Sequence, residues 1–170
     1  MTGLLSRLWA GGWERLADRL ANEKTVITRT GEQVPYLTRW TLFGRRATGR
    51  PGGLAVFLHK FERSDPDHLH DHPWSFTSVI LAGGYFEVTP ADPADPLGPA
   101  VRTWHRPGSV LVRPHPWPHR IELPPGGTAL TLVLRGRKRS SWGFWCPDGW
   151  RRWTEYGRRL DAGLPPCGDE

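Results

Sequence analysis

The segment HLHDHPWSFTSVILAGG, residues 68–84, contains three histidines at alternate positions, followed by a run of apolar and β-branched residues. Alternate residues of an extended strand point to the same face, so His68, His70 and His72 are expected to project one way. Imidazole is the commonest protein ligand of metal ions. Neighbouring members of the series would lie about 6.6 Å apart, and the outer two about 13 Å apart. One ion with bonds of about 2.1 Å therefore bridges one neighbouring pair, and the residues alone leave both pairs open.

This segment resembles the first motif of the cupin superfamily, G-x5-H-x-H-x3-4-E-x6-G. When the H-x-H falls on His70 and His72, three residues precede Phe76 and six more lead to Gly83, as the motif requires. A start at His68 overshoots the glycine by two residues. The resemblance therefore implies that the second and third histidines of the run, rather than the first and second, are the ligand pair.

A second segment, GSVLVRPHPWPHRIEL at residues 108–123, resembles the second cupin motif, G-x5-P-x-G-x2-H-x3-N. The glycine, proline and histidine of that motif fall on Gly108, Pro114 and His119, and Pro116 stands where a glycine is usual. In cupins the two motifs lie on facing strands, so the resemblance implies that this histidine converges on the pair from the first motif. The three would hold one divalent ion, Fe(II) or Zn(II), and leave positions open for water or substrate, as catalytic metal sites do.

The chain departs from the cupin motifs at three positions. Phe76 replaces the glutamate ligand, Ser64 replaces the leading glycine and Leu123 replaces the closing asparagine. Without the glutamate, the ligand set resembles that of the three-histidine cupins, such as the thiol and diketone dioxygenases. A neutral triad leaves the ion its full charge, which favours an anionic substrate or a bound hydroxide. Glu87 and Asp71 are candidates to replace the carboxylate, although Asp71 alternates away from the histidine face.

The remaining histidines are given lesser roles. His68 and His115 are expected to border the pocket or to support the ligands through hydrogen bonds. His59 and His105 are interpreted as ordinary strand residues, although the role of His105 is left open.

Tryptophans and arginines near the motifs are candidates for the pocket. Trp74 and Trp117 each follow a proline next to an expected ligand, so they are expected to wall the pocket or to pack at its rim. Arg39, Arg113 and Arg135 lie in expected strands and are candidates to bind a substrate carboxylate, but the choice among them needs the strand register.

The chain as a whole predicts an all-β fold, which the resemblance specifies as a double-stranded β-helix, or jelly-roll, cupin barrel with short N- and C-terminal helices. Its 170 residues include 20 glycines, 17 prolines and ten tryptophans, as expected for many short strands joined by turns. No helical pattern separates these strands, so they are expected to pair antiparallel. The expected strands are residues 25–30, 36–43, 54–60, 76–82, 85–89, 101–105, 109–113, 119–123, 128–134 and 142–146.

Three parts are expected along the chain: an N-terminal amphipathic helix (1–22) packed on the barrel, the barrel itself (23–147), and a C-terminal helix and tail (148–170). Apolar residues recur at helical spacing near the N-terminus, and docking on the barrel is favoured over a membrane surface or a partner. Near the C-terminus, Trp150, Trp153, Tyr156 and Leu160 also follow helical spacing.

Charge and cysteine content indicate the environment. The formal net charge of +6 and the runs of arginine are interpreted as a solvated surface, so nucleic-acid binding is not favoured. Cys146 and Cys167 are the two cysteines, which do not make a disulfide framework; a reducing cytoplasm is expected, with Cys146 as a buried, inert thiol. The charged residues among the first twenty argue against a signal peptide or a membrane span.

The favoured function is a metal-dependent cupin enzyme acting on a small molecule, most plausibly a mononuclear non-haem Fe(II) oxygenase. A zinc enzyme is the alternative, because the His-Asp-His-Pro-Trp run is similar to the cupin part of hydrazine-forming biosynthetic enzymes. The third reading is a non-catalytic small-molecule-binding or structural cupin, including a homodimeric one, in which the metal braces the barrel. Fold alone does not separate these classes.

Overall fold

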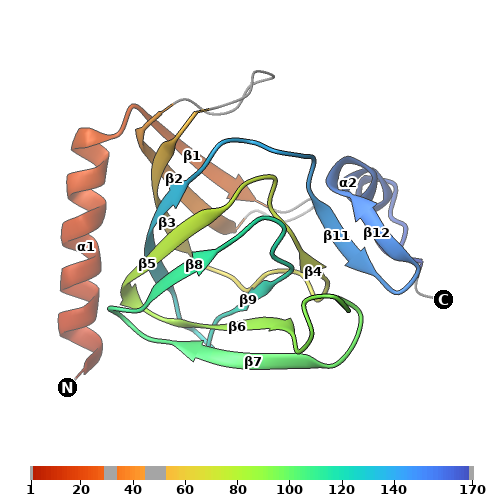
Figure 1. The fold of residues 1–170 in the computed structure, drawn as a ribbon. Coiled ribbons are helices and arrows are strands. Elements are labelled where there is room, and N and C mark those ends of the chain that lie inside the picture. The colour runs from red at the N-terminus through yellow and green to blue at the C-terminus, as the bar shows by residue number, and fades with distance from the viewer. Residues whose placement is uncertain (1, 29–33, 45–52, 169–170) are drawn as a thin grey trace.

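The computed structural model describes residues 2–28, 34–44 and 53–168, in which short antiparallel strands lie between one helix near each end (Figure 1). Most of the expected strands are present with ends shifted by one or two residues; the last two residues of the first one lie outside the described part. The elements are α1 (Thr2–Leu20), β1 (Glu23–Thr28), β2 (Pro35–Phe43), β3 (Ala55–Phe61), β4 (Leu69–His70), β5 (Phe76–Gly83), β6 (Tyr85–Pro90), β7 (Ala100–His105), β8 (Val110–Arg113), β9 (Arg120–Glu122), β10 (Ala129–Arg135), β11 (Gly143–Cys146), β12 (Gly149–Arg152) and α2 (Trp153–Asp161).

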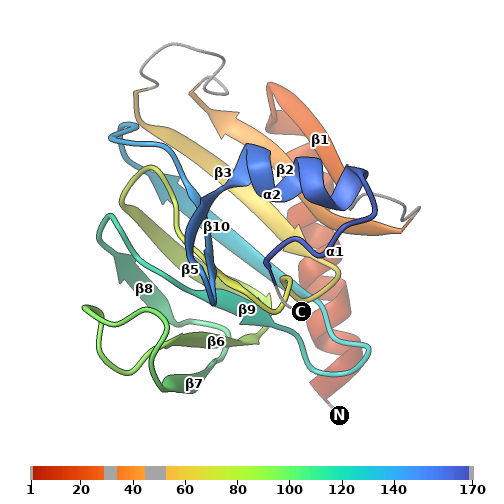
Figure 2. The ribbon, with the colours of Figure 1, turned by 90° about the vertical axis from the view of Figure 1, so that its right-hand side faces the viewer.

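The strands form two layers. One layer is a six-stranded sheet with the order β1-β2-β3-β10-β5-β8, in which every neighbouring pair is antiparallel. The other layer consists of β7-β6-β9 and β12-β11-β4, joined by an isolated bridge between His70 and His119. Figure 2 shows β6, β7 and β9 lying under the large sheet. The expected all-β jelly-roll fold is confirmed.

Side chains alternate between two cores, as the two-residue period of a strand requires. Between the layers, Phe61 of β3 and Ile80 of β5 belong to the barrel interior. On the outer face of the large sheet, Leu58 and Leu130 pack with Ala17 of α1. α1 runs along this outer face (Figure 1), and the sheet covers only part of its apolar stripe, because Trp9, Leu16 and Leu20 stay exposed.

The C-terminal region differs from the sequence prediction. The helical spacing of its aromatic residues predicted one helix from Trp150 onward, but residues 149–152 form β12, which pairs with β11 as a hairpin. Gly149 has φ of 116°, a conformation that other residues rarely adopt, and it allows the tight turn. α2 begins only at Trp153.

In the described part of the chain, no helix is long and apolar enough to cross a membrane.

The cysteines also differ from the prediction: Cys146 and Cys167 form a disulfide, so the expectation of an inert thiol at Cys146 was wrong. Both residues are buried in a cluster with Phe144 and Tyr156. The chain after α2 folds back over β11 and brings the two Cα atoms to 5.3 Å. The two cysteines are 21 residues apart in the sequence, and this spacing does not predict their pairing, which depends on how α2 packs on β11.

Reduction of this disulfide is expected to lower the free energy of unfolding by about 3 kcal/mol, because the bond closes a loop of 21 residues in the unfolded chain. Denaturant unfolding with and without reductant measures the difference. The double variant Cys146→Ser/Cys167→Ser is the control, since reductant should not change its stability. Equal stability of the wild type in both conditions would contradict the prediction.

Candidate metal centre

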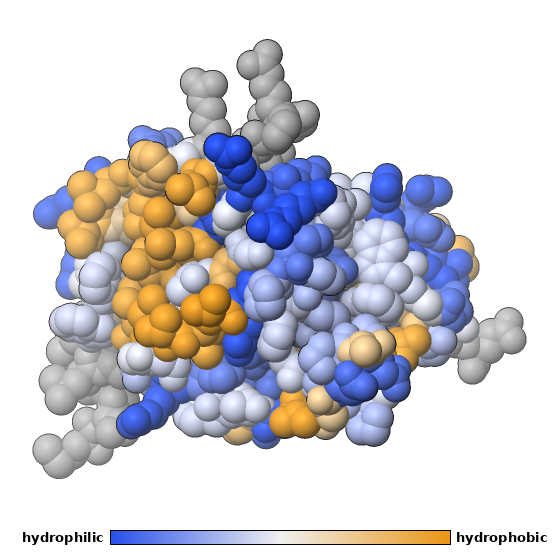
Figure 3. All heavy atoms as spheres, viewed as in Figure 1, coloured by the Kyte–Doolittle hydropathy of each residue, from blue (hydrophilic) through white to orange (hydrophobic). Residues whose placement is uncertain are grey.

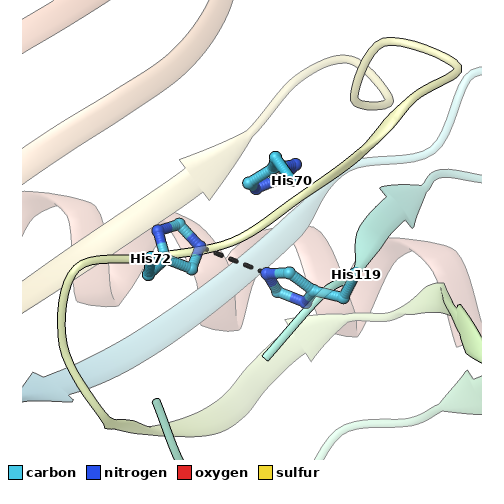
Figure 4. A group of neighbouring side chains, drawn as sticks. All are labelled: His70, His72 and His119. Carbon is cyan, nitrogen blue, oxygen red and sulfur yellow. Dashed lines mark hydrogen bonds between the residues drawn. The ribbon is translucent and has the colours of Figure 1, made fainter. Parts of the chain in front are cut away.

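Three histidines from separate parts of the chain meet inside the barrel. His70 is the last residue of β4, His72 follows two residues later, and His119 directly precedes β9. His70 and His119 are opposite each other and exchange two backbone hydrogen bonds of 2.9 Å, so their side chains share a face. Figure 4 shows the three rings turned toward one another. One ring nitrogen from each residue lies within 4.8 Å of the other two.

The spacing of these nitrogens suits one metal ion. Nε2 of His72 and Nε2 of His119 are 3.1 Å apart. Two ligands with bonds of about 2.1 Å lie about 3.0 Å apart at a right angle and about 3.4 Å apart at a tetrahedral angle. The centroid of the His70 ring lies 5.1 Å from that of the His72 ring and 5.0 Å from that of the His119 ring. The three histidines are therefore spaced as ligands of one divalent ion would be.

Glu87 of β6 orients the His119 ring through the nitrogen that does not face His72. Its Oε1 lies 2.9 Å from Nδ1 of His119, and its Oε2 lies 3.0 Å from Nε2 of His105. Burial raises the pKa of Glu87, but hydrogen bonds from His119 and Arg113 outweigh burial, so the pKa is lowered overall and the group is ionised. An ionised carboxylate only accepts, so Nδ1 of His119 carries the proton and Nε2 keeps its lone pair. Glu87 thus supports the group from outside it.

Asp65 lies behind His70. Its Oδ2 is 4.0 Å from Nδ1 of His70, and the carboxylate accepts hydrogen bonds from the Tyr36 hydroxyl and from the backbone N–H of Ile121. Burial lowers the pKa of His70 to about 4, with Asp65 acting in the opposite direction. Burial also lowers the pKa of His72 well below 6.5, and the neighbouring histidines add to the effect. Both rings are neutral at pH 7, the form that binds metal.

Aromatic side chains surround the three histidines. Phe76 lies 5.1 Å from the His72 ring and 5.7 Å from the His119 ring, so the residue at the usual glutamate position does face the group. Trp74 stacks on His72, with ring planes inclined by 13°. Phe144 of β11 lies 5.8 Å from the His70 ring. These rings limit the access of water to one side of the histidines.

The expectation that three alternate histidines project one way was wrong for His68. β4 contains only Leu69 and His70, so the extended geometry ends on both sides of that pair. Nδ1 of His68 lies 3.1 Å from the hydroxyl of Tyr156 in α2, away from the group. Asp71 also points away, as alternation predicts, and accepts hydrogen bonds from Gly143 N–H and Trp150 Nε1.

Other predicted site residues support the loops. Nδ1 of His115 lies 2.8 Å from the carbonyl oxygen of His72. The Trp117 ring lies under Arg113, at 4.8 Å from the guanidinium carbon, rather than against the histidines. Arg113 is engaged by Glu87, and its Nε donates to Oε1 at 3.0 Å.

Two histidines that the sequence interpretation treated as ordinary strand residues belong to the interior networks. His105 is bound to Glu87, and His59 accepts a hydrogen bond of 2.9 Å from Nε of Arg39. The sequence did contain a signal for the interior position of His59, because this residue alternates with Phe57 and Phe61 along β3 and so shares their face. The role of His105 depends on pairing between β6 and β7, which has no local signature.

Comparison with known proteins gives the fold. No family model matches the sequence, and no curated protein matches it. A cupin 2 conserved barrel domain protein from Rhodopseudomonas palustris is similar, with a TM-score of 0.55 and 12% identity over 75% of this chain and 79% of that chain. The polyketide cyclase RemF from Streptomyces resistomycificus has a TM-score of 0.51 and 18% identity over 84% of this chain and 92% of that chain. The DMSP lyase DddQ from Ruegeria pomeroyi has a TM-score of 0.50 and 20% identity over 75% of this chain and 63% of that chain.

These likenesses agree with the two motifs and with the jelly-roll topology, and the chain has the fold of the cupin superfamily.

Proposed function

We propose that the protein is a metal-dependent enzyme acting on a small molecule, in which His70, His72 and His119 bind one divalent ion. The observation that carries this proposal is the convergence of three ring nitrogens within 4.8 Å, one of them oriented by a buried carboxylate. A bound divalent ion would supply Lewis acidity, or redox chemistry if it is iron. RemF, a polyketide cyclase, and DddQ, a DMSP lyase, have similar folds and act on small molecules, which supports this class of substrate.

The residues around the three histidines would position and shield the ion. Glu87 holds a proton on Nδ1 of His119 and so directs the lone pair of Nε2 inward. The carboxylate of Asp65 lies 4.0 Å from Nδ1 of His70, so it acts on this ring through its charge and not through a hydrogen bond. Phe76 and Trp74 pack against the half-buried His72 ring and limit the access of water to it.

The favoured ion is Fe(II), in an oxygenase, because three imidazoles without a carboxylate match the ligand set of the dioxygenases that the motifs resemble. Zinc in a biosynthetic enzyme is the second candidate, since imidazole suits both metals and the His-Asp-His-Pro-Trp run favours it. A neutral triad leaves the charge of either ion uncompensated, which favours an anionic substrate.

A homodimer is part of the proposal. Figure 3 shows hydrophobic side chains gathered over α1, β5 and β8. Val110 and Val112 of the edge strand β8 are 61% and 68% exposed, and Leu134 of β10 is 46% exposed. A second copy of the chain would bury this face.

A cytoplasmic location is also retained in the proposal. It would make the Cys146–Cys167 disulfide a reversible link, because the cytosol keeps thiols reduced.

Single replacement of His70, His72 or His119 by alanine is expected to remove most of the bound metal, because three protein ligands leave no spare donor. Elemental analysis of protein from iron- and zinc-supplemented cultures gives the metal content and separates the two candidate ions. His68→Ala and His115→Ala are matched controls that should retain metal, since neither ring belongs to the group.

In the same assay, Glu87→Gln should weaken metal binding by about ten- to a hundredfold, because a neutral amide takes the place of the charged carboxylate that orients His119. Full metal content in all three ligand variants would refute the centre. Loss of metal in His68→Ala but not in His72→Ala would shift the ligand pair by two residues.

Phe76→Glu is expected to strengthen zinc binding by about tenfold or more, because an anionic oxygen joins three neutral nitrogens beside His72 and His119. Activity should fall, since the new ligand takes a position used by the substrate. Competition with a chelator measures the affinity, and Phe76→Gln is the control of equal size without the charge. Equal zinc affinity of the folded glutamate variant and the wild type would show that position 76 does not reach the ion.

Val112→Glu is expected to shift the protein from dimer to monomer, because it places a charge on the exposed apolar face of β8. Sedimentation equilibrium measures the mass in solution. Val26→Glu, at an exposed position of β1 on the opposite edge of the sheet, is the control. A wild type that is monomeric at every concentration would contradict the homodimer.

A further inference from the structure

Residues 162–168, the segment that follows α2, are anchored to β11 by the disulfide. Among these residues, Cys167 is the one that is buried, and both it and Cys146 at the end of β11 are 0% exposed. Two side-chain hydrogen bonds of 2.7 Å to the carbonyl oxygens of Pro165 and Pro166 add to this anchor. The segment therefore depends on the covalent link for its contact with the buried interior.

The strand that carries Cys146 also supports the first proposed metal ligand. β11 pairs with β4, and Phe144 is directly opposite His70. β4 consists of two residues at the edge of its sheet, so β11 supports it on one side and the single bridge to His119 supports it on the other (Figure 1). The position of His70 therefore depends on the order of β11.

Asp71, the residue between the two ligands of the first motif, is fixed by the same hairpin. Its N–H donates to the carbonyl oxygen of Gly143 at 3.1 Å, and its Oδ1 accepts a hydrogen bond of 2.9 Å from the N–H of Gly143. Its Oδ2 accepts a hydrogen bond of 3.0 Å from Nε1 of Trp150 in β12. Because Asp71 stands between His70 and His72 in the chain, β11 and β12 set the direction in which the chain turns from one ligand to the next.

Side-chain contacts connect the disulfide to the ligands. Phe144 and Cys146 are two residues apart on β11 and share a face, where they form a buried cluster with Tyr156 of α2. The Phe144 ring stacks on the Tyr156 ring, with centroids 3.8 Å apart, and lies 5.8 Å from the His70 ring. The hydroxyl of Tyr156 is 3.1 Å from Nδ1 of His68, two residues before His70. The Phe144 ring thus contacts both the cluster that the disulfide closes and a proposed metal ligand.

We propose that the Cys146–Cys167 pair is a redox switch that regulates metal binding by the three histidines. In the disulfide form, residues 162–168 hold β11 and α2 against β4, and the histidines keep the geometry described above. In the dithiol form, this segment opens and β11 moves more freely relative to β4, so the affinity for a divalent ion falls. A redox change of this kind acts by biasing an element that has two arrangements. This role rests on the proposed metal-dependent function.

The reductant is a dithiol, the class of compound that keeps cysteines reduced in the cytosol. One of its thiolates attacks a sulfur of the pair and forms a mixed disulfide, and its second thiolate then releases the reductant as a disulfide. Two electrons and two protons pass to the two cysteine sulfurs, and the metal ion keeps its charge. Both sulfurs are buried, so the attack requires residues 162–168 to open locally. The exchange is reversible, and a disulfide of the same class restores the link.

The coupling acts in both directions. If reduction weakens metal binding by some factor, the bound ion makes the disulfide harder to reduce by the same factor. The zinc-loaded protein is therefore expected to keep its disulfide at a ratio of dithiol to disulfide that already reduces the metal-free protein.

The test is the zinc affinity of the full chain before and after reduction with dithiothreitol, measured by competition with a chelator once the reductant has been removed without oxygen. Reduction is expected to weaken zinc binding by about five- to a hundredfold while circular dichroism shows the β fold retained. Cys146→Ser/Cys167→Ser should have the affinity of the reduced chain and should not respond to the reductant. Arg159→Gln is the matched control with unchanged affinity, because it removes one hydrogen bond of the segment and leaves the disulfide intact.

Hydrogen exchange of the metal-free chain gives a second readout that needs no ion. Reduction should speed the exchange of the Asp71 N–H, which donates to Gly143 of β11. The amides of β10, in the middle of the six-stranded sheet, should exchange at unchanged rates and serve as the internal control.

The outcomes separate this inference from the proposed function. Equal zinc affinity of the oxidised and reduced chains would overturn the inference and leave the metal centre standing. Loss of zinc through global unfolding of the reduced chain would also overturn it, because a switch requires a folded reduced form. A chain that binds no zinc in either form, yet loses protection at Asp71 on reduction, would refute the proposed function and support the coupling of the disulfide to the histidine segment.

Discussion

The pair of backbone hydrogen bonds between His70 and His119 is the constraint on which the centre depends. Each residue donates its N–H to the carbonyl of the other at 2.9 Å, and this bridge joins β4 and β11 to β9 and β6 in the second layer. Antiparallel residues that exchange both bonds put their side chains on one face. The bridge therefore fixes two rings of the group, and His72 reaches it two residues further along the same chain. Asp65 reinforces the bridge, because its N–H donates to the carbonyl of Ile121 and its carboxylate accepts from the N–H of Ile121.

A buried charge network holds the other side of His119. Glu87 is bound to two histidines and one arginine, so its negative charge is matched at every oxygen. Breaking a buried ion pair by removing one partner costs several kcal/mol, about 3–5, because the other charge stays buried. The network thus acts as a rigid support, and its rigidity fixes the direction of the His119 lone pair more tightly than strand geometry alone would.

The sequence was sufficient for the fold and for the membership of the histidine group, and insufficient for what surrounds it. The spacing of the cupin motif that the segment resembles selected His70 and His72, because a start at His68 overshoots Gly83 by two residues. The position of Phe76 beside these rings followed from the same spacing. The direction of His68 could not be predicted, because the end of β4 depends on pairing with β11, more than seventy residues away. The contact of Arg113 with Glu87 likewise depends on the pairing of strands that are remote in sequence.

The replacement of a ligand carboxylate by Phe76 leaves the histidine group without a charged member. In a cupin with a glutamate ligand, the protein itself neutralises part of the charge of the ion. Here the group consists of three imidazoles, and the nearby carboxylate of Glu87 is committed to His119 and Arg113. Under the proposed function, the negative charge that the cupin motif normally contributes through the protein would arrive with an anionic substrate, because a neutral triad leaves the charge of the ion uncompensated.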